Sequence, residues 1–323
     1  MKVYTGFDGF PRSRRGAALA IGNFDGLHVG HRRILARLAA LAERDGLKSL
    51  VLTFFPHPAR ALAGRDVPLI QTLDQRLDGL RRAGVNGVLV VPLDRSLFAL
   101  TGRAFAERIL AKALGAREVV VGANFRFGRG RACGAADLAA LGRESGFGVT
   151  AVAPVVRGGR TVSSSLIRRL LLEGEVAKAA GLLGSLYELQ GRVVPGQARG
   201  RALGFPTANL LTGHEILPSG VFLTVASVGI RAFPSLTNIG VRPTFGRNPP
   251  GVETHLLGFR GDLYGRIVRL GFVRKLRNER RFATPEALVR QVDRDLDSAR
   301  AAFLDISGRM RHVLDSREKN PGA

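Results

Sequence analysis

Residues 17–31 read AALAIGNFDGLHVGH and set the architecture of the first half of the chain. The segment begins with an almost uninterrupted apolar run, as expected of a strand that is buried on both faces of a sheet. A turn of small and polar residues follows, and a helical pattern of apolar residues begins at Val29. A buried strand, a glycine-containing turn and an amphipathic helix in succession predict an α/β domain with a parallel sheet.

The same alternation continues as far as residue 183. Apolar runs predict strands over residues 17–24, 48–55, 87–93, 118–125 and 148–156. Periodic segments predict helices over residues 29–45, 73–83, 102–114 and 137–145. This order implies a doubly wound, Rossmann-like sheet with right-handed crossovers, whose ligands bind beyond the carboxyl ends of the strands.

After Leu183 the pattern changes. Glycine and proline become frequent, and short alternating segments appear at residues 189–194, 220–228, 253–259 and 266–273, which predict a small antiparallel β-barrel or a sandwich. A C-terminal helix follows, with Thr284 as N-cap and Pro285 as its first residue. We therefore expect an α/β domain over residues 1–183, a barrel domain over residues 184–310 and a polar tail over residues 311–323.

Length and composition limit the class of protein. The chain has 323 residues, of which 45% are hydrophobic and 23% charged, as expected of two folded domains. No apolar stretch is long enough to span a membrane, and residues 1–15 contain no apolar core of a signal peptide. One cysteine, Cys133, excludes an intrachain disulfide and a thiolate metal cage. These features predict a cytoplasmic protein without a membrane partner.

The net charge of +23 indicates an anionic partner. Arginines outnumber lysines 43 to 6, which suits bidentate phosphate contacts but is equally explained by codon composition. Nucleotide substrates and nucleic acid both fit this charge. The cations are spread over both halves of the chain, and the sequence contains no recognition-helix or RNA-binding motif. Specific nucleic-acid binding is therefore not expected.

The turn from Gly22 to His31 has the features of a phosphate site. Small residues allow a close backbone approach, and the N–H groups at the start of a helix attract anions. His28 and His31 are three residues apart, so both rings can face one side of the first helical turn. Gly22 and Phe24 belong to the same turn. Neither a Walker loop nor a GxGxxG fingerprint is present, so a polyphosphate would be bound in another way.

Three further segments end at the same predicted edge of the sheet. TFFPHP (residues 53–58) and VGANFRFG (121–128) follow the second and fourth strands, and VSSSLIR (162–168) opens a helix after the fifth. In the last segment Ser164, Ser165 and Arg168 can grip a second phosphate group. The aromatic residues of the other two can stack on a flat ring, although such residues are more often part of a core.

The second half contains a glycine-rich segment, GRVVPGQARGRALGFPTANL, over residues 191–210. Its glycines, Gly191, Gly196 and Gly204 among them, can wrap a phosphate chain with backbone N–H groups. Thr207 and Asn209 point the same way if the segment is extended, and their oxygens suit Mg²⁺. Glu253 begins a later strand and can act as a general base for a hydroxyl group, although such an acid is more often a solvated residue at the end of a strand. Arg277 precedes the final helix in LRNERRF (276–282) and is a further candidate binding residue; a salt-bridged surface loop is the alternative.

Together these segments resemble the prokaryotic bifunctional riboflavin kinase/FAD synthetase family, from about residue 17 to residue 300. The resemblance rests on GNFDGLHVGH, TFFPHP, VGANFRFG and VSSSLIR in the first half. In the second half it rests on GRALGFPTANL, NIGVRPTFG (238–246), VETHLL, GDLYG (261–265) and LRNERRF. The second half departs from the usual pattern at Gly258, where Asp is common. The first departs at Asn124, Ser165 and Leu166, which stand for Asp, Thr and Arg.

The resemblance implies two ATP-dependent reactions. The barrel would phosphorylate riboflavin to FMN, with Glu253 as base and with Thr207 and Asn209 holding Mg²⁺ and the phosphates of ATP. The first domain, an FMN adenylyltransferase, would join AMP to FMN and release FAD and pyrophosphate. There His28 and His31, completed by Ser164, Ser165 and Arg168, would bind the phosphates of ATP, and Asn124 and Phe127 would line the flavin side.

Two alternatives remain at this point. A pantetheine-phosphate or nicotinate-mononucleotide adenylyltransferase would keep the first fold and change the acceptor, and a nucleic-acid-binding protein would explain the charge.

Overall fold

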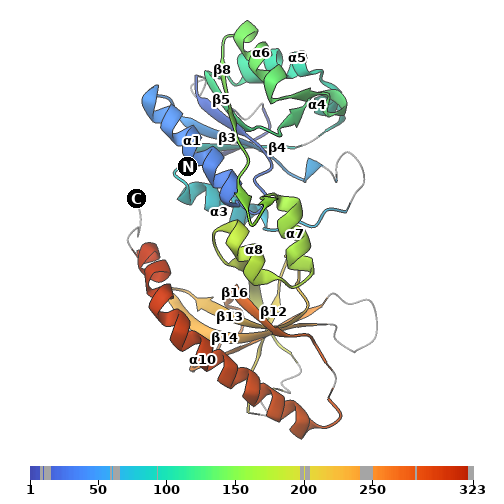
Figure 1. Ribbon diagram of the computed structural model, residues 1–323, viewed down its shortest axis with the longest axis vertical. Coiled ribbons are helices and arrows are strands. Elements are labelled where there is room, and N and C mark those ends of the chain that lie inside the picture. The colour runs from blue at the N-terminus through green and yellow to red at the C-terminus, as the bar shows by residue number, and fades with distance from the viewer. Residues whose placement is uncertain are drawn as a thin grey trace. The chain divides into compact units, whose positions relative to one another are not determined.

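The computed structural model describes residues 1–7, 10, 16–58, 60, 66–92, 94–196, 200, 204–240, 250–280 and 282–318, without the side chains of residues 95, 285, 302 and 304–318. The chain divides into two compact units, which Figure 1 shows. The first comprises Met1–Arg168 with Leu182–Gly184, and the second comprises Arg169–Gly181 with Ser185–Ala323. The sequence predicts the boundary at residue 183. In the structure, the segment Arg169–Gly181 already belongs to the second compact unit.

A parallel six-stranded sheet forms the centre of the first unit. Its order is β1-β4-β3-β2-β5-β8, and every neighbouring pair is parallel. The strands are β1 (Lys2–Thr5), β2 (Ala18–Ile21), β3 (Ser49–Phe54), β4 (Gly87–Val91), β5 (Glu118–Gly122) and β8 (Gly148–Val152). The five predicted strands are confirmed. The edge strand β1 was not predicted, because its residues are mostly exposed and form no apolar run.

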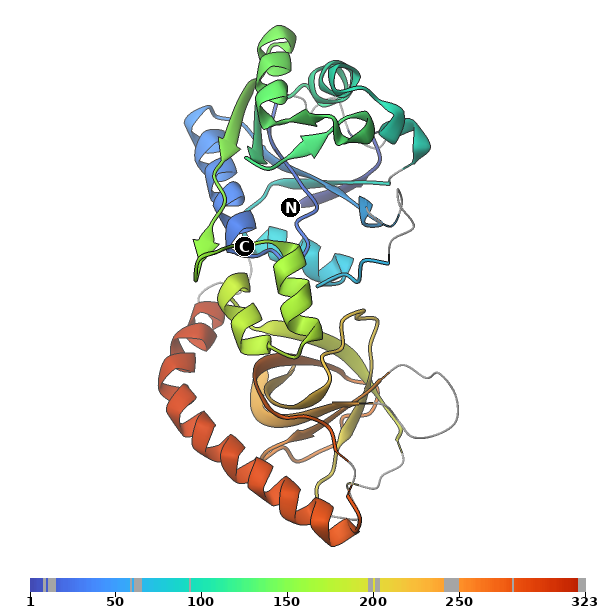
Figure 2. The same cartoon turned by 45° about the vertical axis from the view of Figure 1, so that its right-hand side comes forward.

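Helices cover both faces of this sheet (Figure 2). Successive residues of a strand point to opposite faces, so Ala18 and Ala20 pack with α1 (Val29–Arg44) and α3 (Leu73–Arg82). Leu19 and Ile21 pack on the other side, against α6 (Ala135–Ser145) and the π-helix η2 (Phe105–Ala113). The helix predicted over residues 102–114 is thus divided into α5 (Gly102–Ala104) and η2, whose backbone bonds close wider turns than those of an α-helix.

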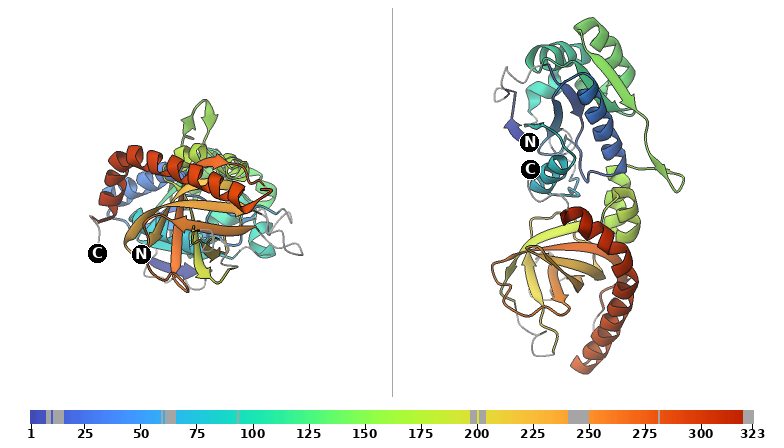
Figure 3. Two further views of the ribbon diagram at one scale, coloured as in Figure 1. Left: turned by 90° about the horizontal axis from the view of Figure 1, so that it is seen from below. Right: turned by 90° about the vertical axis from the view of Figure 1, so that its left-hand side faces the viewer.

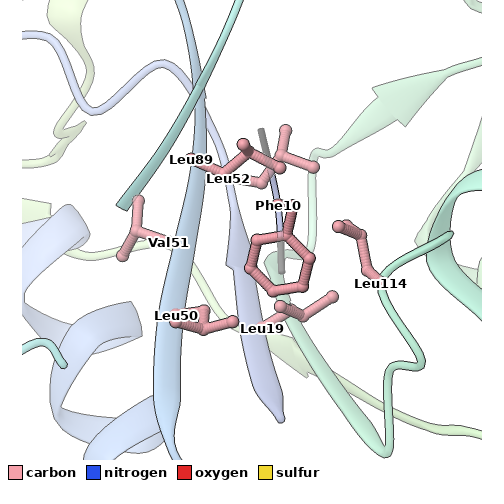
Figure 4. Close-up of a pocket in the computed structure, with 7 residues that line it drawn as sticks. All are labelled: Phe10, Leu19, Leu50, Val51, Leu52, Leu89 and Leu114. Carbon is pink, nitrogen blue, oxygen red and sulfur yellow. The ribbon is translucent and has the colours of Figure 1, made fainter. Parts of the chain in front are cut away.

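A small cavity lies on the η2 side of the sheet (Figure 4). Its lining is apolar throughout and consists of Phe10, Leu19, Leu50, Val51, Leu52, Leu89 and Leu114. A cavity without a convergent polar group fits a packing gap in the core better than a ligand site. We therefore place the functional site elsewhere, at the carboxyl ends of the strands.

Shorter elements complete the first unit and lead out of it. They are α4 (Arg95–Ala99), the pair β6 (Arg126–Phe127) and β7 (Cys133–Gly134), the 3₁₀ turn Arg129–Arg131, and the hairpin of β9 (Val156–Arg157) and β10 (Arg160–Thr161). Figure 3 shows this hairpin standing away from the sheet. The strand predicted over residues 148–156 ends at Val152, before this hairpin begins. Helix α7 (Ser164–Leu172) is capped by Ser163, whose hydroxyl accepts the N–H of Leu166, and α8 (Val176–Leu183) follows.

The second unit is a closed antiparallel barrel in the order β11-β12-β15-β14-β13-β16, which decides between barrel and sandwich. The strands are β11 (Tyr187–Val194), β12 (Ala208–Leu211), β13 (Gly220–Val228), β14 (Arg231–Gly240), β15 (Gly251–Leu256) and β16 (Ile267–Arg277). The four predicted strands are confirmed, and β12 and β14 are additional. A row of buried hydroxyl groups crosses the barrel: Thr224 contacts Ser235 and Thr237 at 2.7 Å, and Thr237 donates to Thr254 at 3.0 Å.

Helix α10 (Pro285–Glu318) lies along the barrel (Figures 1 and 2). Leu296 and Ala299 pack against Leu223 and Leu236 of the barrel strands. The predicted N-cap is confirmed, because the N–H of Ala287 donates to the hydroxyl of Thr284. The helix continues to residue 318, so residues 311–318 are helical, whereas the sequence predicts a polar tail there.

Candidate functional site

The strand order of the first unit places a ligand crevice beside β2. From β2 the chain proceeds to β3 and β4 on one side, and then to β5 and β8 on the other. Ligands of doubly wound sheets bind where the strand order reverses in this way, outside the carboxyl ends of the strands. Here that position lies between the ends of β2 and β5. The turn from Gly22 to His28 follows β2, and Asn124 follows β5.

The two histidines of the turn lie against each other at the start of α1. Their rings are stacked, with centroids 3.6 Å apart, and the ring of His31 also contacts Phe24 at 5.1 Å. His28 is the N-cap of α1, since its Nδ1 accepts the N–H of His31 at 3.2 Å. This cap fixes the tautomer, because an Nδ1 that accepts leaves the proton of a neutral imidazole on Nε2.

Both histidines are neutral near pH 7. Burial lowers the pKa of His28 from 6.5 to about 4, and a backbone hydrogen bond offsets part of that change. Burial lowers the pKa of His31 well below its ordinary value, and the charges of His28, when it is protonated, and of Arg76 lower it further. The Nδ1 of His31 is buried and has no partner among the described residues. The pair can therefore offer N–H groups to an anion rather than two positive charges.

The backbone carbonyl groups of the turn accept hydrogen bonds from side chains of other segments. The hydroxyl of Thr53 donates to Asn23 O at 3.0 Å, the amide of Gln71 to Phe24 O at 3.1 Å, and the hydroxyl of Ser164 to Asp25 O at 2.9 Å. Phe24 and Leu27 have positive φ, a conformation that successive carbonyl anchors help to hold. With three consecutive carbonyl oxygens occupied in this way, the backbone of the turn is fixed, and two of its N–H groups are bonded as well, Gly22 to Leu52 O at 3.1 Å and Leu27 to Phe24 O at 3.4 Å.

The carboxylate of Asp25 fixes the same turn. It accepts the N–H of Ile70 at 3.1 Å and a guanidinium N–H of Arg168 at 2.8 Å, and Arg168 also donates to Pro68 O at 2.6 Å. Ser164 and Arg168, predicted to grip a phosphate, are thus both bonded to Asp25. In this structure they hold the turn from Gly22 to His28, which we call the phosphate turn after its predicted role, and Asp25 is a residue that the sequence reasoning missed.

The other predicted residues of the first unit differ in exposure. Asn124 and Ser165 are exposed and available to a ligand. Phe127 is buried in the core, where its ring packs against Phe105 and Phe125. Phe127 is 7% exposed, and its place against the flavin stays a prediction. Gly22 has a packing role, because a Cβ there would lie 3.3 Å from the ring of Phe24.

The barrel brings its predicted polar residues into one row. Asn209 of β12 lies opposite Glu253 of β15, and Glu253 lies opposite Asn238 of β14. Opposite residues of antiparallel strands have Cβ atoms about 4.5–5.5 Å apart and share a face. Glu253 alternates with the buried residues Val252 and Thr254, so this face is not the one that fills the barrel. Asn238 was quoted only as part of a motif, and its Oδ1 is buried and without a partner in the described part of the chain.

The glycine-rich segment approaches this row closely. A Cβ on Gly196 would lie 2.1 Å from Nδ2 of Asn209, and a Cβ on Gly200 would lie 3.2 Å from Oγ1 of Thr207. Gly191 packs instead against the backbone of Leu211, and Gly204, at φ +86°, faces open space. Residues 197–199 and 201–203 of this segment, residues 241–246 of NIGVRPTFG and Arg281 lie outside the described residues.

Arg277 is occupied by helix α10. Its guanidinium donates to Asp295 at 2.9 Å and forms an ion pair with it at 2.8 Å, and Gln291 donates to the same carboxylate. In this structure Arg277 thus forms the salt bridge considered as the alternative, and its role in binding a substrate stays a prediction.

Each half of the chain matches a known protein family. The family described as FAD synthetase matches residues 10–166, and the family described as riboflavin kinase matches residues 183–303. Bifunctional riboflavin kinase/FMN adenylyltransferase from Escherichia coli K12 is 38% identical over 307 residues, which cover 94% of this chain and 98% of that protein. The chain belongs to this family.

Other members of the family have a similar sequence identity to this chain. The Pseudomonas fluorescens protein is 37% identical, over 93% of this chain and 97% of its own, and the Bacillus subtilis protein is 31% identical, over 90% and 93%. A solved structure titled as a macrolide-efflux protein from Streptococcus pneumoniae aligns with a TM-score of 0.85 at 27% identity, covering 93% of this chain and 99% of that one. Across the described residues, no helix is long and apolar enough to cross a membrane.

Proposed function

We propose that this member of the family makes FMN and FAD at two separate sites. The barrel transfers the γ-phosphoryl group of ATP to the 5′-hydroxyl of riboflavin. The first unit then joins FMN to the adenylyl group of a second ATP and releases pyrophosphate. The observation that carries this assignment is the distribution of groups: the barrel offers a carboxylate at its polar row, and the phosphate turn offers neutral imidazoles and backbone N–H groups.

The kinase step needs a base because its nucleophile is a hydroxyl group. We assign this role to Glu253, which would accept the proton as the hydroxyl oxygen attacks the γ-phosphorus and ADP departs. Thr207 and Asn209 would hold Mg²⁺ through their side-chain oxygens, a small protein ligand set that Mg²⁺ accepts when phosphates complete the shell. The close approach of Gly196 and Gly200 to these two side chains fits such a cradle, since any Cβ would fill it. Bound Mg²⁺ would offset the negative charge of the phosphates.

The adenylyl step needs no base, because the phosphate of FMN is already an anion. Its oxygen attacks the α-phosphorus of ATP, a new P–O bond forms, and the bond to the β-phosphate oxygen breaks. The turn then has to align the phosphates and stabilise developing charge. The Nε2–H of His28 is suited to this, since its Nδ1 is occupied by the N–H of His31. Exposed Ser165 and Asn124 complete the proposal, on the phosphate and flavin sides respectively.

Matched variants with separate substrates test the division of labour. Purified protein with riboflavin, ATP and Mg²⁺ is expected to yield FMN and then FAD, detected by chromatography. Glu253→Gln should abolish FMN formation and leave the conversion of added FMN to FAD unchanged. His28→Ala combined with His31→Ala should do the reverse. If both variants stay folded and each loses both products, the assignment of one reaction to each unit is wrong.

The small molecules ATP, riboflavin and FMN are sufficient partners for this proposal, and neither nucleic acid nor a membrane enters it. We place the reactions in the cytoplasm, where ATP is available, as expected for a chain with a single cysteine.

A further inference from the structure

Three charged side chains are buried together behind the phosphate turn. Asp25 is 0% exposed, Arg76 of α3 is 1% exposed, and Arg168 of α7 is 9% exposed. Arg168 donates to the Asp25 carboxylate at 2.8 Å, whereas Arg76 lies on the other side of that carboxylate at 3.9 Å. Arg76 is thus an ion-pair neighbour of Asp25 without a direct hydrogen bond to it.

The contacts of Arg76 connect α3 to the end of β3. Its Nη1 donates to Phe54 O at 3.2 Å and to Thr53 Oγ1 at 3.4 Å, and the same Thr53 hydroxyl donates to Asn23 O of the turn. The Nε of Arg76 is buried and finds no acceptor among the described residues. Arg76 therefore stands one hydroxyl group away from the backbone of the phosphate turn and retains an unused donor.

The charges of this group do not cancel. Two guanidinium groups and one carboxylate leave one net positive charge, and Asp25 is the sole carboxylate that pairs with either arginine in the part of the chain described here. A buried cation without full compensation is costly. Burial accordingly lowers the pKa of Arg76, and the charge of Asp25 offsets only part of that change. Polyphosphate bound at the turn would supply the missing negative charge.

We propose that Arg76 is a positioning residue for adenylyl transfer, which holds the phosphate turn through Thr53 and adds an uncompensated positive charge behind it that favours the pyrophosphate portion of ATP. This inference rests on the proposed adenylyl transfer. It goes further by assigning a residue that is buried, has no ligand motif around it and lies 45 positions after His31. Because the charge is enclosed by protein, salt in the solvent would screen it weakly.

Charge and shape can be separated by two substitutions. Arg76→Gln removes the charge and keeps a donor for Phe54 O, whereas Arg76→Lys keeps the charge and loses the planar fork. Arg82→Met is the matched control, because Arg82 is exposed on the same α3 helix. Titration calorimetry with pyrophosphate alone measures the charge effect without requiring FMN, and the riboflavin kinase rate reports whether the second unit is intact.

Arg76→Gln is expected to weaken pyrophosphate binding at least tenfold and to raise the KM for ATP in FAD formation more than it lowers kcat. Arg76→Lys should stay within threefold of the wild type, as should Arg82→Met. Equal pyrophosphate affinity in wild type and Arg76→Gln would overturn the inference, as would equal losses in the Gln and Lys variants. If Arg76→Gln does not fold, Arg76→Lys decides alone, since a tenfold loss of pyrophosphate affinity contradicts a role of the charge. A wild type that binds pyrophosphate but forms no FAD would refute the proposed function instead.

Discussion

Gly196 offers a test of the kinase site by a single methyl group. A Cβ at this position would lie 2.1 Å from Nδ2, 2.6 Å from Cγ and 3.0 Å from Oδ1 of Asn209. Real Cβ contacts lie at about 3.5–4.0 Å, so Gly196→Ala requires the Asn209 side chain to move by more than about 1 Å. Gly196 does not have a positive φ, so the substitution adds no backbone strain of the left-handed kind.

A displacement of this size is large for a group that is proposed to hold Mg²⁺ and the phosphates of ATP. Misplacement by about 1 Å costs on the order of a hundredfold in rate, which corresponds to about 2.7 kcal/mol of transition-state stabilisation. We expect Gly196→Ala to lower kcat/KM for riboflavin phosphorylation by about that factor. FAD formation from added FMN should stay within twofold, because the phosphate turn belongs to the other unit.

The matched control is Gly213→Ala, since a Cβ on Gly213 meets no atom within 4 Å. Both variants are assayed for FMN formation from riboflavin and for FAD formation from FMN, with thermal unfolding as a check of folding. A folded Gly196→Ala protein that keeps its kinase rate within threefold would refute the role given to Asn209. So would a Gly213→Ala protein that loses as much activity as Gly196→Ala.

Three further predictions concern buried polar groups. Asp25→Asn leaves Arg168 and Arg76 without their carboxylate, so we expect the first unit to lose about 3–5 kcal/mol in urea unfolding; a loss below 1 kcal/mol would contradict the buried ion pair. Thr237→Val removes the donor to Thr254 and a partner of Thr224, which should lower the free energy of unfolding of the barrel by about 1–3 kcal/mol, whereas an unchanged urea midpoint would argue against the hydroxyl row. Burial lowers the pKa of His214 from 6.5 to about 4, with Glu188 and Glu215 offsetting part of the change, so the unfolded chain binds a proton between these pH values that the folded barrel does not. Barrel stability should therefore fall by about 3 kcal/mol from pH 6.5 to pH 4, and less in His214→Gln, as measured by urea unfolding at each pH; equal slopes would contradict the neutral His214.

The sequence predicted some residues of the candidate site and not their partners, because only some of the contacts are local in the chain. The pair of His28 and His31 was predictable because three residues on a helix share a face, and the structure stacks the rings. The partners of Ser164 and Arg168 were not predictable, because Asp25 lies 139 and 143 positions away and carries no local signal. Phe127 and Arg277 show the same limit. The sequence gives the residue type, but it does not tell whether the side chain contacts a ligand, the core or a neighbouring helix.

The amino-acid sequence by itself determined the local structure: buried parallel strands alternating with helices, then short antiparallel strands and a capped final helix. Those features depend on residue spacing and on capping groups close in the chain. Only the tertiary structure decided the order of the strands, the closure of the barrel and the row that joins Asn209, Glu253 and Asn238. It also decided which side chains hold the phosphate turn. Those outcomes depend on contacts between distant segments, whose geometry is set by packing and not by the pattern of any one segment.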